Sequence, residues 1–182
     1  MLFHEGDPAV GMHLLAKGRV CTRVTTPAGD VATLELFVPG EVLGEMALLS
    51  SDTLRSATAI ALEATETLVI GEPTFTDLRR RYPSVTETLV QLLGARVRRL
   101  DERLLEALYV PADTRVMRRL LELMNVYGEV VPLTQNDLAG LAGTTRVTVN
   151  RVLRREEREG SVLLGRRRVQ IVDREAVARR AS

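Results

Sequence analysis

Between residues 84 and 108 the chain contains no proline and one glycine, and its apolar residues recur at intervals of three and four. This spacing is typical of the a and d seam of a two-stranded coiled coil. It predicts one long helix over residues 84–108 that pairs with the same helix of a second copy. The alternative is that the apolar stripe packs against the chain's own domain. The predicted seam consists of Val90, Leu93, Val97, Leu100, Leu104 and Ala107.

Residues 1–83 have a different pattern, in which short apolar runs are separated by turn residues. Residues 31–36 alternate between two faces, as strand residues do. The pattern predicts antiparallel strands that form a small β-barrel or sandwich. Its turns are marked by Gly18, Gly29, Gly40, Gly44 and Gly71.

The long helix is expected to stop at Pro111, because proline lacks an N–H and its ring clashes with the preceding helical turn. Residues 109–113 then form a hinge, in which Asp113 is placed to cap the next helix by accepting backbone hydrogen bonds. We therefore divide the chain into a domain of residues 1–83, the helix of residues 84–108 and a C-terminal domain of residues 109–182.

Charge is distributed unevenly along the chain, although the formal net charge of its 182 residues is only +1. Residues 1–108 contain 11 Lys and Arg against 15 Asp and Glu, whereas residues 109–182 contain 14 against 9. A basic C-terminal part favours contact with nucleic acid.

Several classes of protein are excluded by the composition. No apolar run approaches the length of a membrane span, and the first residues lack the features of a signal peptide, so we expect a cytoplasmic protein. The single cysteine, Cys21, cannot form an internal disulfide, and together with His4 and His13 it supplies too few ligands for a zinc or iron–sulfur site. No arrangement of an activated nucleophile is evident, so we expect no catalysis.

The C-terminal domain carries the signals of a helix-turn-helix motif. Thr134 lies three residues ahead of Asp137, a capping box that starts one helix, and Thr145 is placed to cap a second. The motif also requires a small residue where the helices touch, a glycine in the turn and an inward apolar residue, which are supplied by Ala139, Gly143 and Val149.

The second of these helices is expected to place its first exposed side chains in the major groove of DNA. Arginine suits bidentate contact with guanine, and threonine or asparagine suits contact with phosphate or adenine. Residues 161–173 predict a β-hairpin, a wing whose arginines can lie along phosphates. The alternative is a three-helix bundle with an arginine-coated surface. The predicted DNA contacts are Thr145, Arg146, Val147, Thr148, Asn150 and Arg151 on the helix, with Arg166 and Arg167 on the wing.

Five segments together resemble the cAMP receptor protein family, the Crp/Fnr transcription regulators. They are "FHEGDP", "LLAKGRV", "PGEVLGEMALLSSDTLRSATA", the seam helix and "LTQNDLAGLAGTTRVTVNRVL". The resemblance spans nearly the whole chain and implies an α+β fold: a cyclic-nucleotide-binding β-barrel of the jelly-roll type, a dimerisation helix and a winged helix-turn-helix. It also implies a homodimer that binds double-stranded operator DNA and contacts RNA polymerase.

In that family the stretch that matches residues 44–57, "GEMALLSSDTLRSA", is the phosphate-binding cassette for a cyclic nucleotide. Gly44 lets the backbone approach the ligand, and the short helix after it directs N–H groups toward an anion. Glu45 is suited to accept from a ribose hydroxyl, Arg55 to neutralise the phosphate and Ser56 to donate to it. The resemblance thus implies cAMP or another cyclic nucleotide as effector. The alternative is that Glu45 and Arg55 pair across a hairpin.

The chain departs from the family's pattern at several positions. The hydroxyl residues that meet adenine in cAMP-responsive members are replaced by Leu100 and Asp101, of which only Asp101 can accept from the adenine amino group. Val147 replaces a glutamate of the recognition helix and offers apolar contact, such as with a thymine methyl group. The loop before Thr134 is short, which bears on contact with RNA polymerase. Met1 lies almost at "FHEGDP", so we expect a barrel without its first strand or a start assigned late.

The leading interpretation is a homodimeric transcription regulator in which the ligand sets the register of the two seam helices. That register would set the spacing of the recognition helices at half-sites roughly 34 Å apart. Two alternatives remain open: a regulator with a vestigial sensor that binds DNA without ligand, and an enzyme that consumes the nucleotide.

Overall fold

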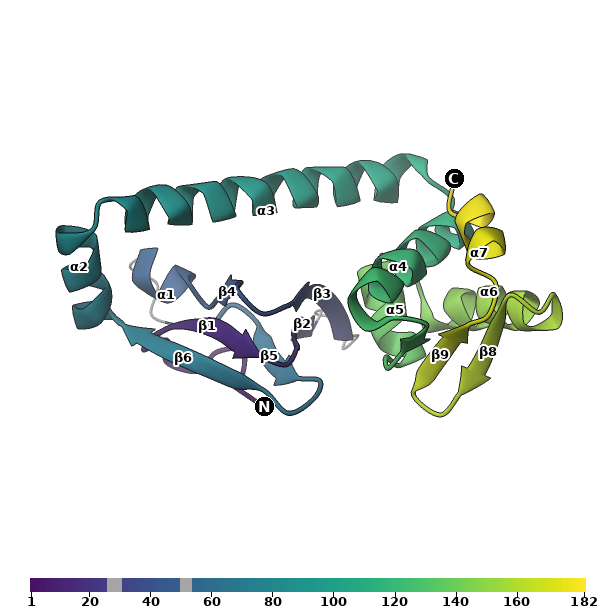
Figure 1. Ribbon diagram of the computed structural model, residues 1–182, viewed down its shortest axis with the longest axis horizontal. Helices are drawn as coiled ribbons and strands as arrows, with labels where there is room; N and C mark the ends of the chain where they lie inside the picture. Colours follow the sequence, from purple (N-terminus) through teal and green to yellow (C-terminus); the bar gives the residue numbers. More distant parts are fainter. Residues whose placement is uncertain (26–30, 50–53) are drawn as a thin grey trace. The chain divides into compact units, whose positions relative to one another are not determined.

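The computed structural model describes residues 1–25, 31–49 and 54–182 (Figure 1). The chain forms two compact units, of which the first comprises residues 1–30 and 34–99 and the second residues 31–33 and 100–182. The turn predicted at residues 26–30 and residues 50–53 of the predicted cassette lie outside the described residues.

The first unit contains two three-stranded sheets. In one sheet β1 (Gly11–Lys17) lies between β4 (Val42–Leu43) and β6 (Glu66–Gly71), and in the other β2 (Val20–Thr25) lies between β3 (Val31–Phe37) and β5 (Thr58–Ala61). The pairs β1–β4, β1–β6 and β2–β5 are antiparallel, and β1 and β6 run side by side (Figure 1). The predicted antiparallel jelly-roll fold is confirmed.

Apolar side chains from both sheets form the core of this unit, a cluster of Leu15, Val20, Phe37, Leu43 and Ala59. The start of the chain closes over this cluster, because its backbone bridges antiparallel to the segment just before and within β5. The bridges join Phe3 to Ala59 and Pro8 to Leu54. The first residues of the chain therefore help to position residues 54–59.

Helix α3 (Ser84–Tyr109) follows α1 (Met46–Leu49) and α2 (Glu72–Arg81), and it confirms the helix predicted over residues 84–108. Leu89 is buried with Met12 and Phe75, and Leu93 packs against the same cluster. Leu93 of the predicted seam therefore contacts the chain's own domain. The other predicted seam residues are exposed: Val90, Val97, Leu100, Leu104 and Ala107.

None of the helices in the described ranges is both long and apolar enough to cross a membrane.

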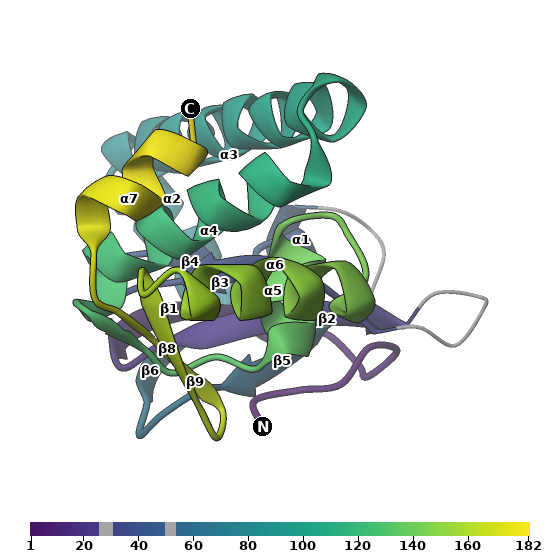
Figure 2. The same cartoon turned by 90° about the vertical axis from the view of Figure 1, so that its right-hand side faces the viewer.

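The second unit is a winged helix-turn-helix. Its elements are α4 (Ala112–Tyr127), β7 (Val130–Val131), α5 (Gln135–Leu141), α6 (Arg146–Arg158), β8 (Val162–Gly165), β9 (Arg168–Ile171) and α7 (Arg174–Arg180). The strand order β7–β9–β8 adds β7 to the predicted hairpin, and α4 packs beside α7 (Figure 2). Strand β7 and helix α7 were not predicted from the sequence.

The start of each helix of the motif is fixed as predicted. Thr134 and Asp137 exchange both hydrogen bonds of the capping box, and the Thr145 hydroxyl accepts from the Thr148 backbone N–H at 3.2 Å. Gly143 makes the turn between the helices with a φ of +60°, a conformation that glycine adopts without a steric penalty.

The prediction that Asp113 caps a helix is wrong. The N-cap position of α4 is Pro111, two residues before Asp113, and it has no side-chain cap. Asp113 therefore already lies in the first helical turn, where its carboxylate pairs with Arg151 and Arg155 of α6. The carboxylate there faces two positively charged guanidinium groups, one of them bidentate, which attract it more strongly than neutral backbone N–H groups do.

Candidate functional site

A pocket in the first unit contains all four predicted ligand residues in its wall: Gly44, Glu45, Arg55 and Ser56. Glu45 and Arg55 are buried, whereas Ser56 is exposed at the pocket. The predicted base contacts Leu100 and Asp101 lie on α3 with exposed side chains, and their contact with a base remains a prediction. The fold thus gathers the predicted phosphate and ribose contacts in one place.

The backbone of Arg55 is held by the start of the chain. Its N–H donates to the carbonyl of Asp7 and its carbonyl accepts from the N–H of Gly6, both at 2.9 Å. The guanidinium lies over the ring of Phe3, with 4.2 Å between its central carbon and the ring centroid. The predicted segment "FHEGDP" therefore positions this arginine from both its backbone and its side chain.

The Arg55 guanidinium has a buried donor that the described residues leave without a partner. The residue is only 6% exposed, and Nη1 donates to the Gly44 carbonyl at 3.1 Å. Its Nε is buried without a hydrogen-bond partner among the described residues. Burial lowers the pKa of Arg55, while the negative charges of Asp7 and Glu45 raise it. A buried guanidinium with a free donor is a site that an anion would complete.

Gly44 is required at its position for two reasons. Its φ of +71° lies in the left-handed region, which side chains other than glycine rarely adopt. A Cβ atom added to Gly44 would clash with Nη1 of Arg55. The glycine therefore leaves the space in which the guanidinium lies.

Glu45 is held by α3. Its Oε1 accepts from Nη1 of Arg96 at 2.9 Å, and Nε of Arg96 lies 2.9 Å from Oε2 of the buried Glu35. Arg99 binds the other oxygen of Glu35 at 3.1 Å. Among the described residues, the carboxylate of Glu45 thus pairs with Arg96, and not with Arg55 as in the alternative that the sequence left open.

His13 lies beside the Arg55 site. Its Nδ1 is 3.2 Å from the hydroxyl of Thr67, and its ring centroid is 5.5 Å from that of Phe3. Burial lowers the pKa of His13, and the positive charge of Arg55 lowers it further. The imidazole is therefore neutral at pH 7.

A basic groove in the second unit lies between the start of α5, helix α6 and the wing. It contains the predicted DNA contacts Arg146, Asn150 and Arg167, together with Arg154 and Arg168. The side-chain amide of Asn150 donates to Gln135, the first residue of α5, at 3.0 Å. Arginines from both the helix and the wing therefore meet in one groove.

The remaining predicted DNA contacts lie outside that groove. Val147 is 78% exposed and Arg166 lies exposed in the turn of the wing. The hydroxyls of Thr145 and Thr148 lie 3.1 Å apart at the start of α6.

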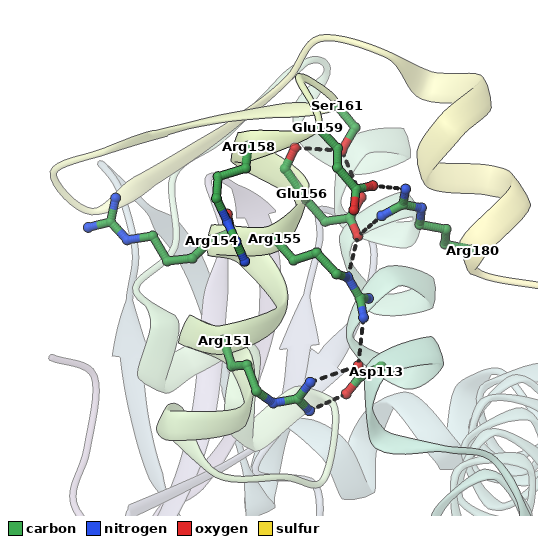
Figure 3. A network of polar contacts seen from close by, with 9 residues as sticks. All are labelled: Asp113, Arg151, Arg154, Arg155, Glu156, Arg158, Glu159, Ser161 and Arg180. Carbon is green, nitrogen blue, oxygen red and sulfur yellow. Dashed lines mark hydrogen bonds and ion pairs between the residues drawn. The ribbon is translucent and has the colours of Figure 1, made fainter.

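Arg151 points toward α4, where it binds Asp113, whereas Arg154 extends from the other side of α6 (Figure 3). Asp113 also accepts from Arg155 at 3.1 Å, and Arg155 in turn lies 3.4 Å from the carboxylate of Glu156. Glu156 is completely buried and accepts from the hydroxyl of Ser161 at 2.7 Å and from Arg180. This network joins α6 to α4, to the start of the wing and to α7 (Figure 3).

Residues 1–82 match the cyclic nucleotide-binding domain, and residues 114–180 match the Crp-like helix-turn-helix domain. The chain is 39% identical over 171 residues to the cyclic AMP receptor protein of Thermus thermophilus. The aligned residues cover 93% of this chain and 79% of that protein. The chain belongs to the Crp/Fnr family. It is a transcription regulator of the Crp/Fnr type, and the family consists of regulators, not enzymes.

Other Crp/Fnr proteins agree with this assignment. A CRP-like cAMP-activated global transcriptional regulator of Mycobacterium tuberculosis is 26% identical over 188 residues, which cover 99% of this chain and 84% of that protein. A crystal structure of a CRP-family transcriptional regulator from Thermus thermophilus has a TM-score of 0.84 at 23% identity, covering 99% of this chain and 92% of that one. The latter similarity supports the fold.

Four charged residues of the two sites were not predicted from the sequence: Glu35, Arg96, Arg154 and Arg168. Glu35 belongs to an alternating strand, and Arg96 stands three and seven residues after Leu93 and Leu89, which pack on the barrel. The spacing of Arg96 was therefore a usable signal. The signal for Arg154 was weaker: it stands four residues after Asn150, on the same side of the helix. The signal for Arg168 was its position directly after Arg167. Within the described ranges, no three His, Cys, Asp or Glu side chains gather as metal ligands would.

Proposed function

We propose that this protein is a homodimeric regulator whose binding to operator DNA is controlled by a cyclic nucleotide, cAMP, bound in the pocket of the first unit. The observation that carries the proposal is the buried Arg55 guanidinium, whose Nε has no partner among the described residues. A positive charge removed from water is costly unless an anion accompanies it. The cyclic phosphate would supply that anion.

The rest of the pocket suits the remainder of such a ligand. Glu45 presents a carboxylate beside Gly44, where it would accept from the ribose hydroxyl, and Ser56 would donate to the phosphate. Apolar side chains from Leu34, Phe37 and Leu43 line the pocket and would contact the base. Two relatives are named for cAMP, which supports this nucleotide as the effector.

The dimer would form along α3. Val90, Val97, Leu100 and Leu104 expose between 52% and 63% of their surface on one helix, at coiled-coil spacing. Arg96 lies on the same helix and binds Glu45 of the pocket. A ligand that changes this contact would favour one register of the two α3 helices over another. Coupling of this kind is typically about 1–3 kcal/mol, or roughly 5- to 150-fold in DNA affinity.

DNA would be bound by the helix-turn-helix. Arg146 and Arg151 would reach guanines, with apolar contact from Val147 between them, and Thr145, Thr148 and Asn150 would contact phosphates or adenine. Arg166 and Arg167 of the wing would lie along phosphates. Contact with RNA polymerase is proposed from family membership alone.

Calorimetric titration of the purified protein with cAMP, with cGMP as a second ligand, tests the sensor. One saturable site per chain is expected, and Arg55→Gln should abolish it. Arg19→Gln is the matched control, because Arg19 pairs with Glu63 at 2.8 Å and does not line the pocket. Absence of heat from a folded dimer would instead favour the alternative, a regulator with a vestigial or differently specific sensor.

DNA binding is tested by fluorescence anisotropy with a duplex selected from random sequence by repeated binding. Arg146→Ala should weaken the complex by about 10- to 100-fold, the effect of one good base contact. Arg179→Ala is the control and should have little effect, because Arg179 lies on α7 and pairs with Glu175 at 4.0 Å. Equal losses in both variants would contradict the assignment of α6 as the reading helix.

A further inference from the structure

Thr22 of β2 carries a hydroxyl that the fold leaves unused. The residue is 7% exposed, and its Oγ1 is buried without a hydrogen-bond partner among the described residues. Buried hydroxyls in proteins are nearly always paired, so each exception needs an explanation. An absent ligand is one such explanation.

The direction of the Thr22 side chain follows from the strand. Side chains two residues apart lie on the same face, so Thr22 shares the inward face with Val20 of the core cluster. Its partner across the strand pair is Ala59, a member of the same cluster. Thr22 therefore points into the interior of the sandwich, away from solvent.

Thr22 also lines the pocket that contains Arg55 and Glu45. Phe37 and Leu43 give this pocket an apolar wall, and Ser56 and Arg96 line it as well. Rotation of Thr22 about its Cα–Cβ bond exchanges the hydroxyl with the methyl group, so the hydroxyl can turn toward a ligand. A flat apolar ring with one hydrogen-bonding edge fits such a wall, and this is the chemistry of a nucleobase.

We propose that Thr22 determines specificity in this pocket, its hydroxyl forming a hydrogen bond with a nitrogen of the six-membered ring, or with the exocyclic group on that ring, of the purine whose cyclic phosphate lies at Arg55. This inference rests on the proposed function and deepens it. A threonine hydroxyl both donates and accepts, so it suits the nitrogen-rich edge of a purine. A base without those nitrogens would leave the hydroxyl unpaired, as it is in the free protein.

The test compares wild type with Thr22→Val, which keeps the shape of the side chain and removes the hydroxyl. Affinity is measured by calorimetry for cAMP and for the cyclic monophosphate of benzimidazole riboside, which lacks the nitrogens of the six-membered ring and the amino group. We expect Thr22→Val to weaken cAMP by about 2- to 12-fold, the range of one neutral hydrogen bond, and to leave the benzimidazole ligand unchanged.

The stability of the ligand-free protein gives a second readout. Because the hydroxyl has no partner to lose, Thr22→Val should leave the thermal midpoint unchanged or raise it. Thr65→Val is the matched control, since the Thr65 hydroxyl donates to the carbonyl of Glu63 at 2.9 Å. That variant should lower the midpoint and leave cAMP affinity unchanged.

The outcomes separate this inference from the proposed function. If wild type binds neither cAMP nor cGMP, the proposed function fails and the inference falls with it. If both proteins bind cAMP equally, or if Thr22→Val weakens both ligands to the same extent, only the role of Thr22 is overturned. A lowered midpoint for Thr22→Val would also overturn it, because the hydroxyl would then have a partner in the free protein.

Discussion

Asp113, in the first turn of α4, binds Arg151 of α6 through both of its carboxylate oxygens. Nη1 of Arg151 lies 3.1 Å from Oδ2 and Nη2 lies 2.5 Å from Oδ1. The hydrogen bonds from Arg151 and its charge hold the pKa of Asp113 below the usual value of 3.8, so the carboxylate is charged at neutral pH. The two nitrogens that face Asp113 are those with which arginine reads guanine end-on.

Replacement of Asp113 by asparagine is therefore expected to strengthen DNA binding. The variant removes a negative charge next to the DNA-reading helix and replaces the ion pairs with Arg151 and Arg155 by weaker neutral hydrogen bonds. We expect about a tenfold gain in affinity, about 1.4 kcal/mol, and a salt dependence steeper by about one phosphate contact. Anisotropy titrations of the selected duplex at several salt concentrations measure both quantities.

Glu175→Gln is the control for this experiment. It also removes one carboxylate from an ion pair with arginine, but on α7, where Glu175 is 90% exposed. Its affinity should match that of wild type. Weaker binding by Asp113→Asn would mean that Asp113 holds Arg151 in the orientation that reads DNA.

Gly44→Ala should disturb the pocket far more than an alanine at a comparable turn. Both Gly44 and Gly40 have positive φ values, of +71° and +92°, so each alanine variant is expected to lose about 1 kcal/mol of stability to backbone strain. Only at Gly44 does the added methyl group meet another residue, at Nη1 of Arg55; at Gly40 nothing lies within 4 Å.

Gly44→Ala is therefore expected to weaken cAMP binding by at least about tenfold, while Gly40→Ala binds as wild type does. Calorimetry of both variants beside their urea denaturation curves separates affinity from stability. Equal affinities in the two variants would show that the position of the Arg55 guanidinium does not matter for binding.

Arg96→Gln should destabilise the first unit, because it leaves two buried carboxylates with fewer partners. Among the described residues, Glu45 loses its ion pair with Arg96, and Glu35 keeps the one with Arg99. Removal of one partner from a buried pair typically costs about 3–5 kcal/mol, and the partial exposure of Arg96 reduces the expected loss to about 2 kcal/mol.

Urea denaturation monitored by circular dichroism measures this loss. Arg98→Gln removes the same charge from the exposed side of α3 and should change stability by less than about 0.5 kcal/mol. In the double variant with Glu45→Gln, part of the loss should be recovered, since no unpaired charge then remains at Glu45. Additive losses would contradict the pairing.

The elements whose signals are local were predicted correctly from the sequence. The period of the apolar residues predicts α3, and the capping box of Thr134 and Asp137 with the turn at Gly143 predicts the helix-turn-helix. These signals act over a few residues, so a linear sequence contains all of their information.

The contacts that were missed join distant parts of the chain. Arg96 and Glu45 are 51 residues apart, and Asp113 and Arg151 are 38 residues apart. A charged residue on a helix looks like a solvated one until the fold supplies its partner, and Asp113 near a helix start looks like a cap. The four predicted ligand residues line one pocket, and they were grouped by the resemblance and not by a local pattern; their role in binding stays a prediction.

The pKa of His13 is expected to report on the charge at Arg55. Burial and, second, the charge of Arg55 lower this pKa below the ordinary 6.5. As the pH falls below about 6.5, His13 becomes protonated in the unfolded chain but stays neutral in the folded protein. The free energy of unfolding therefore decreases with falling pH until the folded pKa is reached, and it retains its full value above 6.5.

A phosphate at Arg55 would offset the positive charge that opposes protonation of His13, so bound cAMP should raise the pKa of His13. Arg55→Gln should raise it in the free protein for the same reason. The imidazole resonances, followed by NMR over pH 4.5–8, give this pKa directly, and a His4→Gln variant assigns the signals because the chain has only two histidines. An unchanged or lower pKa in the presence of saturating cAMP would place the phosphate away from Arg55.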